Sequence, residues 1–137
     1  MKPQAIICDL DGTLALRGNR DPYDMARASE DKVNIQVATV VKAMNAMGFD
    51  VFFTSGRSEV ARDDTHEWLE ENVGIAQFEL MMRAQGDLRP DSKIKKEMLD
   101  IIQLSHDVFL VLDDRDSVVK MWRENRIPTW QVNYGDF

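Results

Sequence analysis

Residues 5–13 read AIICDLDGT, and they show the junction of strand and acidic turn on which the predicted fold is built. Four apolar residues, 5–8, form a short strand pattern that ends at Asp9. Asp9 and Asp11 are two positions apart, so in an extended backbone both side chains point to the same side. An Asp followed by Gly12 is also ordinary turn chemistry after a strand. The stretch therefore predicts a strand whose carboxyl end carries two acidic side chains.

The alternation of strand and helix patterns continues along the chain. Apolar runs and 3.6-residue periodicities predict helix 33–47, strand 51–54, helix 58–73, strand 78–82, helix 90–104, strand 108–112, a helix around 118–122 and strand 129–132. Gly48 ends the first helix, and Asp91 or Ser92 is expected to cap the third. Five strands alternating with four helices predict an α/β, three-layer sandwich with a parallel sheet and helices on both faces.

The composition sets limits on the class of protein. A length of 137 residues with 44% hydrophobic residues predicts one globular domain over 1–137. Seventeen basic and 24 acidic residues give a net charge of −7, which argues against sequence-blind coating of nucleic acid. One cysteine, Cys8, makes no internal disulfide. With neither a signal-peptide pattern nor a membrane-spanning apolar run, we expect a cytoplasmic protein without membrane contact.

Polar residues gather at three predicted strand ends. These ends are residues 9–13, 54–57 and 113–115, and in parallel sheets ligands bind outside the carboxyl ends of the strands. Asp113 and Asp114 join the first acidic pair there, although the alternative of a plain helix cap stays open. Several carboxylates without a nearby histidine form a hard-oxygen site suited to Mg²⁺.

The same residues suit phosphoryl transfer. A carboxylate can attack phosphorus and form an aspartyl-phosphate, while a neighbouring acid protonates the leaving oxygen and later activates water. Ser55 and a lysine are natural holders of the phosphoryl oxygens. Lys95 lies near the positive N-terminus of the third predicted helix, with Lys93 as the alternative. Asp91 precedes Lys95 by four residues, a spacing that allows the two side chains to pair.

At this point the chain resembles the haloacid-dehalogenase (HAD) phosphohydrolases. Their four signatures are matched in order by residues 9–13, Ser55, Lys95 and Asp113-Asp114. The resemblance narrows to the 3′-phosphatase half of phage-type polynucleotide kinase–phosphatase, on five blocks of sequence: Arg20-x-Pro22-Tyr23-Asp24, Ser55-Gly56-Arg57, Arg83-x-Gln85-Gly86-Asp87-x-Arg89, Leu112-Asp113-Asp114-Arg115 and Gln131-Val132-x-x-Gly135-Asp136-Phe137.

The resemblance implies a role for each matched residue. It implies that Asp9 is the nucleophile and a metal ligand, and that Asp11 is the general acid/base with its backbone carbonyl at the metal. Asp113 and Asp114 would complete a Mg²⁺ site. Ser55 and Lys95 would hold the phosphoryl group, and the remaining substrate contacts would come from Thr13, Arg20, Gly56, Arg57, Arg83 and Asp91. For the arginines, ordinary surface salt bridges remain the alternative.

The resemblance also implies an HAD-like (Rossmann-like) fold without a large cap domain. Residues 15–31 are too few for a folded domain and are expected to form a loop or flap over an open site. Residues 1–137 contain no GxxxxGK[ST] motif, so this chain is not expected to phosphorylate 5′ ends, and a separate kinase or ligase is a possible partner.

The leading function hypothesis is a Mg²⁺-dependent phosphatase that removes 3′-phosphates from DNA or RNA ends through an aspartyl-phosphate. A phosphatase for a nucleotide or sugar phosphate is the main alternative, and the net charge of −7 favours it slightly. A receiver-type phosphoacceptor domain or a non-catalytic binding module is more distant. A receiver would carry its phosphoacceptor at the end of the third strand, where this chain has Met82-Arg83.

Overall fold

The structure is a computed structural model that describes residues 1–18, 21, 23–24, 28 and 30–137. Its elements in chain order are β1 (Gln4–Asp9), β2 (Ala15–Leu16), β3 (Lys32–Val33), α1 (Ile35–Ala46), β4 (Asp50–Ser58), the short 3₁₀ helix η2 (Glu59–Ala61), α2 (Arg62–Asn72), β5 (Glu79–Arg83), α3 (Asp91–Gln103), β6 (Asp107–Asp113), α4 (Asp116–Glu124) and β7 (Thr129–Gln131).

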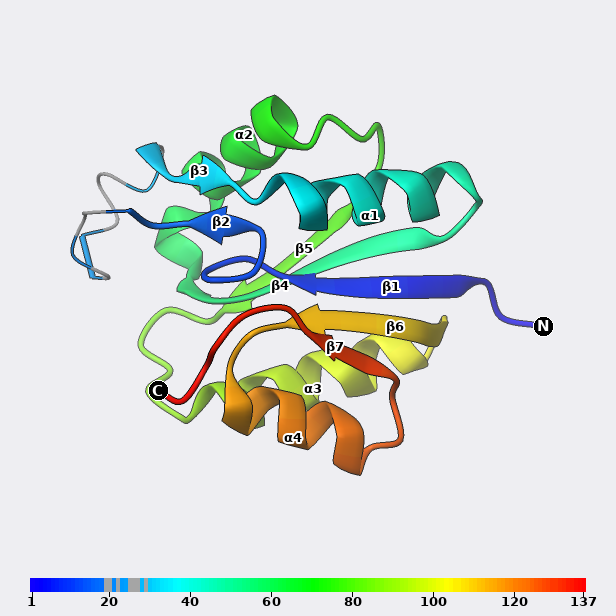
Figure 1. Ribbon diagram of the computed structural model, residues 1–137. Coiled ribbons are helices and arrows are strands. Elements are labelled where there is room, and N and C mark those ends of the chain that lie inside the picture. The colour runs from blue at the N-terminus through cyan, green and yellow to red at the C-terminus, as the bar shows by residue number, and fades with distance from the viewer. Residues whose placement is uncertain (19–20, 22, 25–27, 29) are drawn as a thin grey trace.

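A five-stranded parallel sheet in the order β5-β4-β1-β6-β7 forms the middle layer. Helices α1 and α2 cover one face, and α3 and α4 cover the other (Figure 1). The predicted three-layer α/β sandwich is therefore confirmed, and the described residues include no large cap domain. Among those same residues, no helix is long and apolar enough to cross a membrane.

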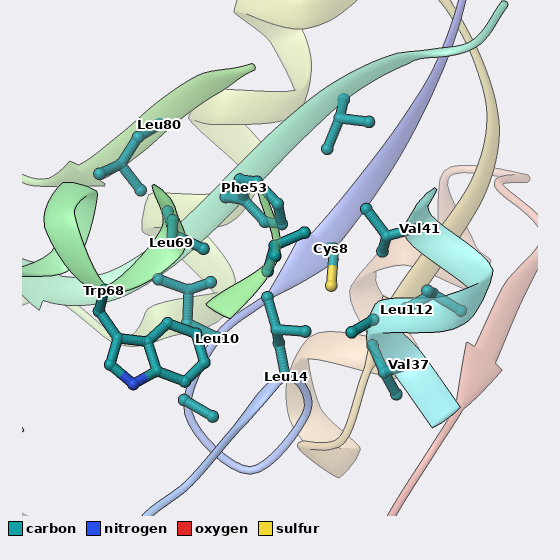
Figure 2. Close-up of a cluster of buried hydrophobic side chains, with 14 of the residues drawn as sticks. Cys8, Leu10, Leu14, Val37, Val41, Phe53, Trp68, Leu69, Leu80 and Leu112 are labelled. Atoms are coloured by element: carbon teal, nitrogen blue, oxygen red, sulfur yellow. The ribbon is translucent and has the colours of Figure 1, made fainter. Parts of the chain in front are cut away.

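The alternating side chains of β1 explain why the sheet is covered on both faces. Ile6 and Cys8 pack into a cluster with α1 and α2, which Figure 2 shows together with Trp68. Ala5 and Ile7 pack into a second cluster with α3 and α4. Because side chains alternate along a strand, Asp9 points to the same face as Ile7, toward α3. The functional acid at the end of β1 therefore faces α3 and α4.

The segment expected to be a loop over residues 15–31 begins in strand β2 and is followed directly by strand β3. Ala15 and Leu16 pair antiparallel with Val33 and Lys32, which makes a two-stranded sheet beside the main one. The first predicted helix accordingly starts at Ile35 instead of residue 33, because Val33 is used in this pairing. The predicted site residue Arg20 lies outside the described residues.

Two predicted helix starts differ in detail. The helix predicted over 58–73 is wrong at Ser58, which is the last residue of β4, and it begins with the 3₁₀ turn η2. Val60 on this turn is 72% exposed, so it packs against no buried face. The third helix is preceded by Pro90, without a side-chain cap, whereas the sequence predicted a cap by Asp91 or Ser92. Asp91 is the first residue of α3, and its carboxylate is taken up by two arginines described below.

Candidate active site

The carboxyl ends of β1, β4 and β6 meet at one edge of the sheet, because β1 lies between the other two. There the buried Asp9, Asp113 and Asp114 each offer a carboxylate oxygen, and these oxygens lie within 4.8 Å of one another. Ser55, three residues before the end of β4, is also buried. The strand ends that the sequence singled out are thus brought together by the parallel sheet.

Lys95 reaches this cluster from the first turns of α3. Its Nζ lies 2.5 Å from Asp9 Oδ1 and 3.1 Å from Asp113 Oδ2, and the residue is only 2% exposed. Lys93 is exposed, and Lys96 pairs with Asp100 on the surface. Of the three lysines in this turn, Lys95 is therefore the one at the acids.

The charges at the cluster do not balance. Burial raises the pKa of the Asp9 carboxyl well above its ordinary value, and the neighbouring Asp113 raises it further, while Lys95 lowers it. Burial likewise raises the pKa of Asp114. For Lys95, burial alone lowers the pKa, but Asp113 and Asp9 outweigh it and raise the pKa above the ordinary value, so the ammonium stays charged. Three carboxylates face one ammonium.

Hydrogen bonds divide the three acids into two kinds. Asp113 accepts at Oδ1 from the backbone N–H groups of Asp114 and Arg115, and at Oδ2 from Lys95 and the buried Trp122 indole. These four donors use the four lone-pair sites of its carboxylate. Asp9 and Asp114 accept fewer bonds and keep oxygen sites for a further ligand. The donor set, hard oxygens with excess negative charge, fits a divalent cation such as Mg²⁺.

The turn after β1 supports Asp9. The Thr13 hydroxyl, fully buried, is 2.8 Å from Asp9 Oδ2 and 3.2 Å from Asp114 Oδ1. Gly12 has a φ of +82°, and a Cβ there would lie 2.1 Å from Asp114 Oδ2. Glycine is therefore required by both the backbone conformation and the closeness of Asp114. Thr13, predicted to contact substrate, lies where it orients the acids.

Asp11 is held by Arg57. The Arg57 Nε and Nη2 atoms lie 2.9 and 2.7 Å from the two Asp11 oxygens, which is a bidentate pair. The guanidinium is itself fixed by Thr65 at 3.1 Å and by Asp31 at 3.3 Å, both buried. The backbone N–H of Arg57 also donates to the Ser55 hydroxyl. Arg57, predicted as a substrate contact, is thus placed to orient the Asp11 carboxylate.

A second arginine network surrounds Asp91. Arg83 pairs with one oxygen of Asp91, and Arg115 Nη1 lies 2.7 Å from the other. Arg83 also donates to the carbonyls of Gly56, Asp87 and Arg89. A Cβ on Gly56 would come within 2.7 Å of Asp91, so this glycine permits the close contact. Asp91 therefore pairs with arginines, and Lys95, four residues on, turns to Asp9 and Asp113 instead.

Sequence reasoning missed several residues that the fold brings to the site. Arg115 directly follows the Asp113-Asp114 pair, and that position was a signal in the sequence. Asp31, Thr65 and Trp122 carried none, because they are distant in sequence from every motif and become neighbours only through packing.

A cavity of about 690 Å³ opens in front of the acids. Its lining combines Asp9, Asp11, Lys95, Asp113 and Asp114 with Arg83, Arg115 and the exposed side chains of Tyr23 and Leu88. Ser55 itself does not line the cavity, although its neighbours Gly56 and Arg57 do. Tyr23 comes from the segment between β2 and β3, and Leu88 from the loop before α3. The cavity therefore joins the buried acidic cluster to a partly apolar rim.

Comparison with known proteins identifies the relatives of this arrangement. Residues 3–137 match the family model of the polynucleotide kinase PNKP phosphatase domain. The chain is 38% identical over 130 residues to a protein of Autographa californica nuclear polyhedrosis virus named as a bifunctional polynucleotide kinase/RNA ligase. That match covers 93% of this chain and 19% of the viral protein, so the chain spans about a fifth of this relative.

Solved structures agree with the family match. A chain in the structure of the Pnkp1/Rnl/Hen1 RNA repair complex is 46% identical and superposes with a TM-score of 0.93, over 99% of this chain and 44% of that one. The class C acid phosphatase of Bacillus anthracis, 17% identical, has a TM-score of 0.70 over 97% of this chain and 69% of that one. The acid phosphatase shows likeness of fold alone, and it confirms the HAD-like architecture expected from the sequence.

Proposed function

The chain belongs to the family of polynucleotide kinase PNKP phosphatase domains and is a phosphatase domain, and on that premise we propose that it removes 3′-phosphates from DNA or RNA ends. The observation that carries the proposal is the buried cluster of Asp9, Asp113, Asp114 and Lys95 at one end of a cavity. Relatives named for polynucleotide kinase and RNA ligase, or found in an RNA repair complex, support a nucleic-acid end as substrate.

The proposed reaction has two steps. In the first, an oxygen of the Asp9 carboxylate attacks phosphorus, the ester P–O bond breaks, and Asp11 gives its proton to the departing 3′-oxygen. In the second, Asp11 takes a proton from water, the water oxygen attacks phosphorus, and inorganic phosphate leaves as the Asp9 carboxylate is restored. Lys95 and Ser55 hold the phosphoryl oxygens in both steps, and Arg57 aims the Asp11 carboxylate.

The metal part of the proposal follows from the donor set. Asp9 and Asp114 would bind Mg²⁺ directly, and Asp113, whose oxygens already accept four bonds, would act through water or by orienting its neighbours. The backbone carbonyl of Asp11 is the further ligand that the resemblance implies. When bound, the cation would neutralise charge on the phosphoryl group during the reaction.

We extend the proposal to the surroundings of the site. Residues 1–137 would act as one domain, with 15–31 as a flap over the cavity. The position of Tyr23 in the cavity lining and the bond between Asp31 and Arg57 support this role. A separate kinase or ligase would work on the same ends, as the names of the relatives suggest. The lone, buried Cys8 is in keeping with a cytoplasmic setting.

Phosphate release from three substrates tests the proposal. These are an oligonucleotide with a 3′-phosphate, the same oligonucleotide with a 5′-phosphate, and a small aryl phosphate, each with Mg²⁺ and with EDTA. We expect metal-dependent release that strongly favours the 3′-phosphate and is lost in Asp9→Asn, which keeps the size of the side chain. Release mainly from the aryl phosphate or the 5′ end would keep the Asp9 chemistry and overturn the 3′-phosphate assignment, and a preference for the aryl phosphate would favour a small-molecule phosphatase.

A further inference from the structure

The segment Gln131–Gly135, which follows β6 and α4 in the chain, lies against the loop that carries Asp113 and Asp114. We call it the strap. Three hydrogen bonds join the two: Val132 N–H to the Asp113 carbonyl at 3.1 Å, Gln131 Nε2 to the Asp114 carbonyl at 2.9 Å, and Asp116 N–H to the Gly135 carbonyl at 2.8 Å. The backbone carbonyls of both acids are therefore held by the strap.

Gly135 makes the closest contact. A Cβ added there would lie 1.7 Å from the Asp114 carbonyl oxygen and 2.7 Å from Arg115 Cα, and both of these are backbone atoms. Real Cβ contacts are essentially never below 3.0 Å, so a side chain would push the strap and the Asp114 backbone apart by more than 1 Å. No positive φ explains this glycine, so the requirement for Gly135 is spatial.

The strap also accepts a hydrogen bond from the start of α4. Asp116 is the first residue of α4, and the first backbone N–H groups of a helix have no acceptor within the helix. The Asp116 N–H donates to the Gly135 carbonyl instead. Gln131 Nε2 lies 2.6 Å from Asp116 Oδ1 as well. The strap thus joins the end of β6 to the beginning of α4, which are the two ends of the loop that presents Asp114.

We infer that the strap is a positioning device for divalent-metal binding, with Gly135 and Gln131 as positioning residues that set the distance of Asp114 from Asp9. The inference rests on the metal site of the proposed function. Mg²⁺ requires near-ideal octahedral geometry with oxygens at 2.0–2.1 Å. A displacement of Asp114 by about 1 Å therefore weakens the site strongly, although neither positioning residue touches the metal. This positioning role would explain the motif Gln131-Val132-x-x-Gly135 that the sequence analysis singled out.

Mn²⁺ binding to the whole chain, measured by titration calorimetry, tests the strap. We expect Gly135→Ala to weaken Mn²⁺ binding by about 10- to 100-fold, the usual loss when a partner of a metal ligand is removed. Gln131→Ala removes the two hydrogen bonds of the amide, to the Asp114 carbonyl and to Asp116 Oδ1, and should weaken binding by about 3- to 10-fold. In both variants, saturating Mn²⁺ should restore most of kcat, because the reacting groups themselves remain.

Gly48→Ala is the matched control. Gly48 lies two residues after the end of α1, with a φ of +101° and nothing within 4 Å of a Cβ placed there, so alanine strains the backbone at a site away from the strap. Its melting temperature in EDTA should fall while its Mn²⁺ affinity stays at the parent value. If Gly135→Ala also keeps the parent affinity and only melts earlier, the strap is merely structural and the inference fails.

Two further outcomes are decisive. If Gly135→Ala does not fold, Gln131→Ala alone decides, and an affinity equal to that of the parent chain overturns the inference. If the parent chain itself binds no Mn²⁺, the proposed metal site is wrong, and this result appears before any variant is compared. Failure of the strap and failure of the proposed function are therefore distinguishable.

Discussion

Replacing Arg57 by methionine should uncouple Asp11 from its support. Methionine keeps much of the buried volume of the side chain but offers no donor to the Asp11 oxygens, which Arg57 holds at 2.9 and 2.7 Å. The Asp11 side chain is 46% exposed, so without this bidentate pair its orientation is held less firmly in the variant. The protonation of the leaving oxygen, the role proposed for Asp11, should then fail most of the time.

The size of the effect follows from the two bonds. A hydrogen bond to a charged group contributes about 1.5–3 kcal/mol, and solvent at the exposed Asp11 reduces this toward the lower end. Two such bonds correspond to about 3 kcal/mol, or about a 100-fold loss of rate at 1.4 kcal/mol per factor of ten. General acid catalysis typically supplies 10²–10⁴-fold, so the loss is large but not complete.

The assay compares leaving groups under single-turnover conditions, with enzyme in excess. An oligonucleotide 3′-hydroxyl is a poor leaving group that needs a proton, whereas an aryl oxide leaves without much help. The product followed is the leaving group of the first step, which is the 3′-hydroxyl oligonucleotide or the aryl alcohol. We expect Arg57→Met to slow formation of the 3′-hydroxyl oligonucleotide by about 100-fold and formation of the aryl alcohol by less than about tenfold. Measuring only the first step avoids the later hydrolysis of the aspartyl-phosphate, which also uses Asp11.

Thr65→Val is the companion variant. It removes the 3.1 Å hydrogen bond between Thr65 and Arg57 while keeping the guanidinium. The rate with the oligonucleotide should therefore again fall more than the rate with the aryl phosphate, but both losses should be smaller than in Arg57→Met. Equal losses on both substrates in Arg57→Met would refute the reasoning. Such a result would mean that Arg57 serves the phosphoryl group that both substrates share, as the sequence first suggested, and that its pairing with Asp11 has no part in proton transfer.

The remaining predictions concern the acidic cluster. Asp9→Asn should abolish turnover on every substrate, because an amide cannot form the acyl phosphate; a stopped-time phosphate assay checks it, and residual turnover near the parent rate would rule out Asp9 as nucleophile. Gly12→Ala should cost about 1–2 kcal/mol of stability through its φ of +82° and should also weaken Mn²⁺ binding, because its Cβ meets Asp114, as melting curves with and without the metal would reveal. In EDTA, the free energy of unfolding should fall as the pH rises from 3.8, the ordinary carboxyl pKa, through the raised pKa of Asp9, since the folded chain then holds a proton that the unfolded chain has lost. Denaturant titrations across this range should show the fall flattened in Asp9→Asn, and a flat profile in the parent chain would contradict the raised pKa.

Much of the fold was predictable from local pattern. Apolar runs ending in acids, such as residues 5–9 and 108–113, identify buried parallel strands because both of their faces must be covered. The helices followed from their apolar periodicity. The errors concern the ends of elements. Val33 was predicted to start a helix but pairs with Ala15 in a strand. Asp91 was predicted as a helix cap, but its carboxylate pairs with two arginines.

Local sequence patterns were enough to show which chemistry is available: paired carboxylates, a serine and a lysine at strand and helix ends, in the order of a known phosphatase family. They could do so because these signatures are local and each lies directly beside the element that presents it. Lys95 was preferred over Lys93 in the sequence only through the family resemblance, and the structure supplies the physical reason, because Lys95 is the lysine that reaches Asp9 at the buried end of β1.

The groups that support the acids could be identified only from the three-dimensional packing. Arg57 lies 46 positions from Asp11 in sequence, Trp122 donates to Asp113 across a buried face, and Gly135 lies against the backbone of Asp114. Such contacts join segments that meet only when the sheet is assembled. No local pattern encodes them, because hydrogen-bond geometry and close packing depend on positions in space and not on spacing along the chain.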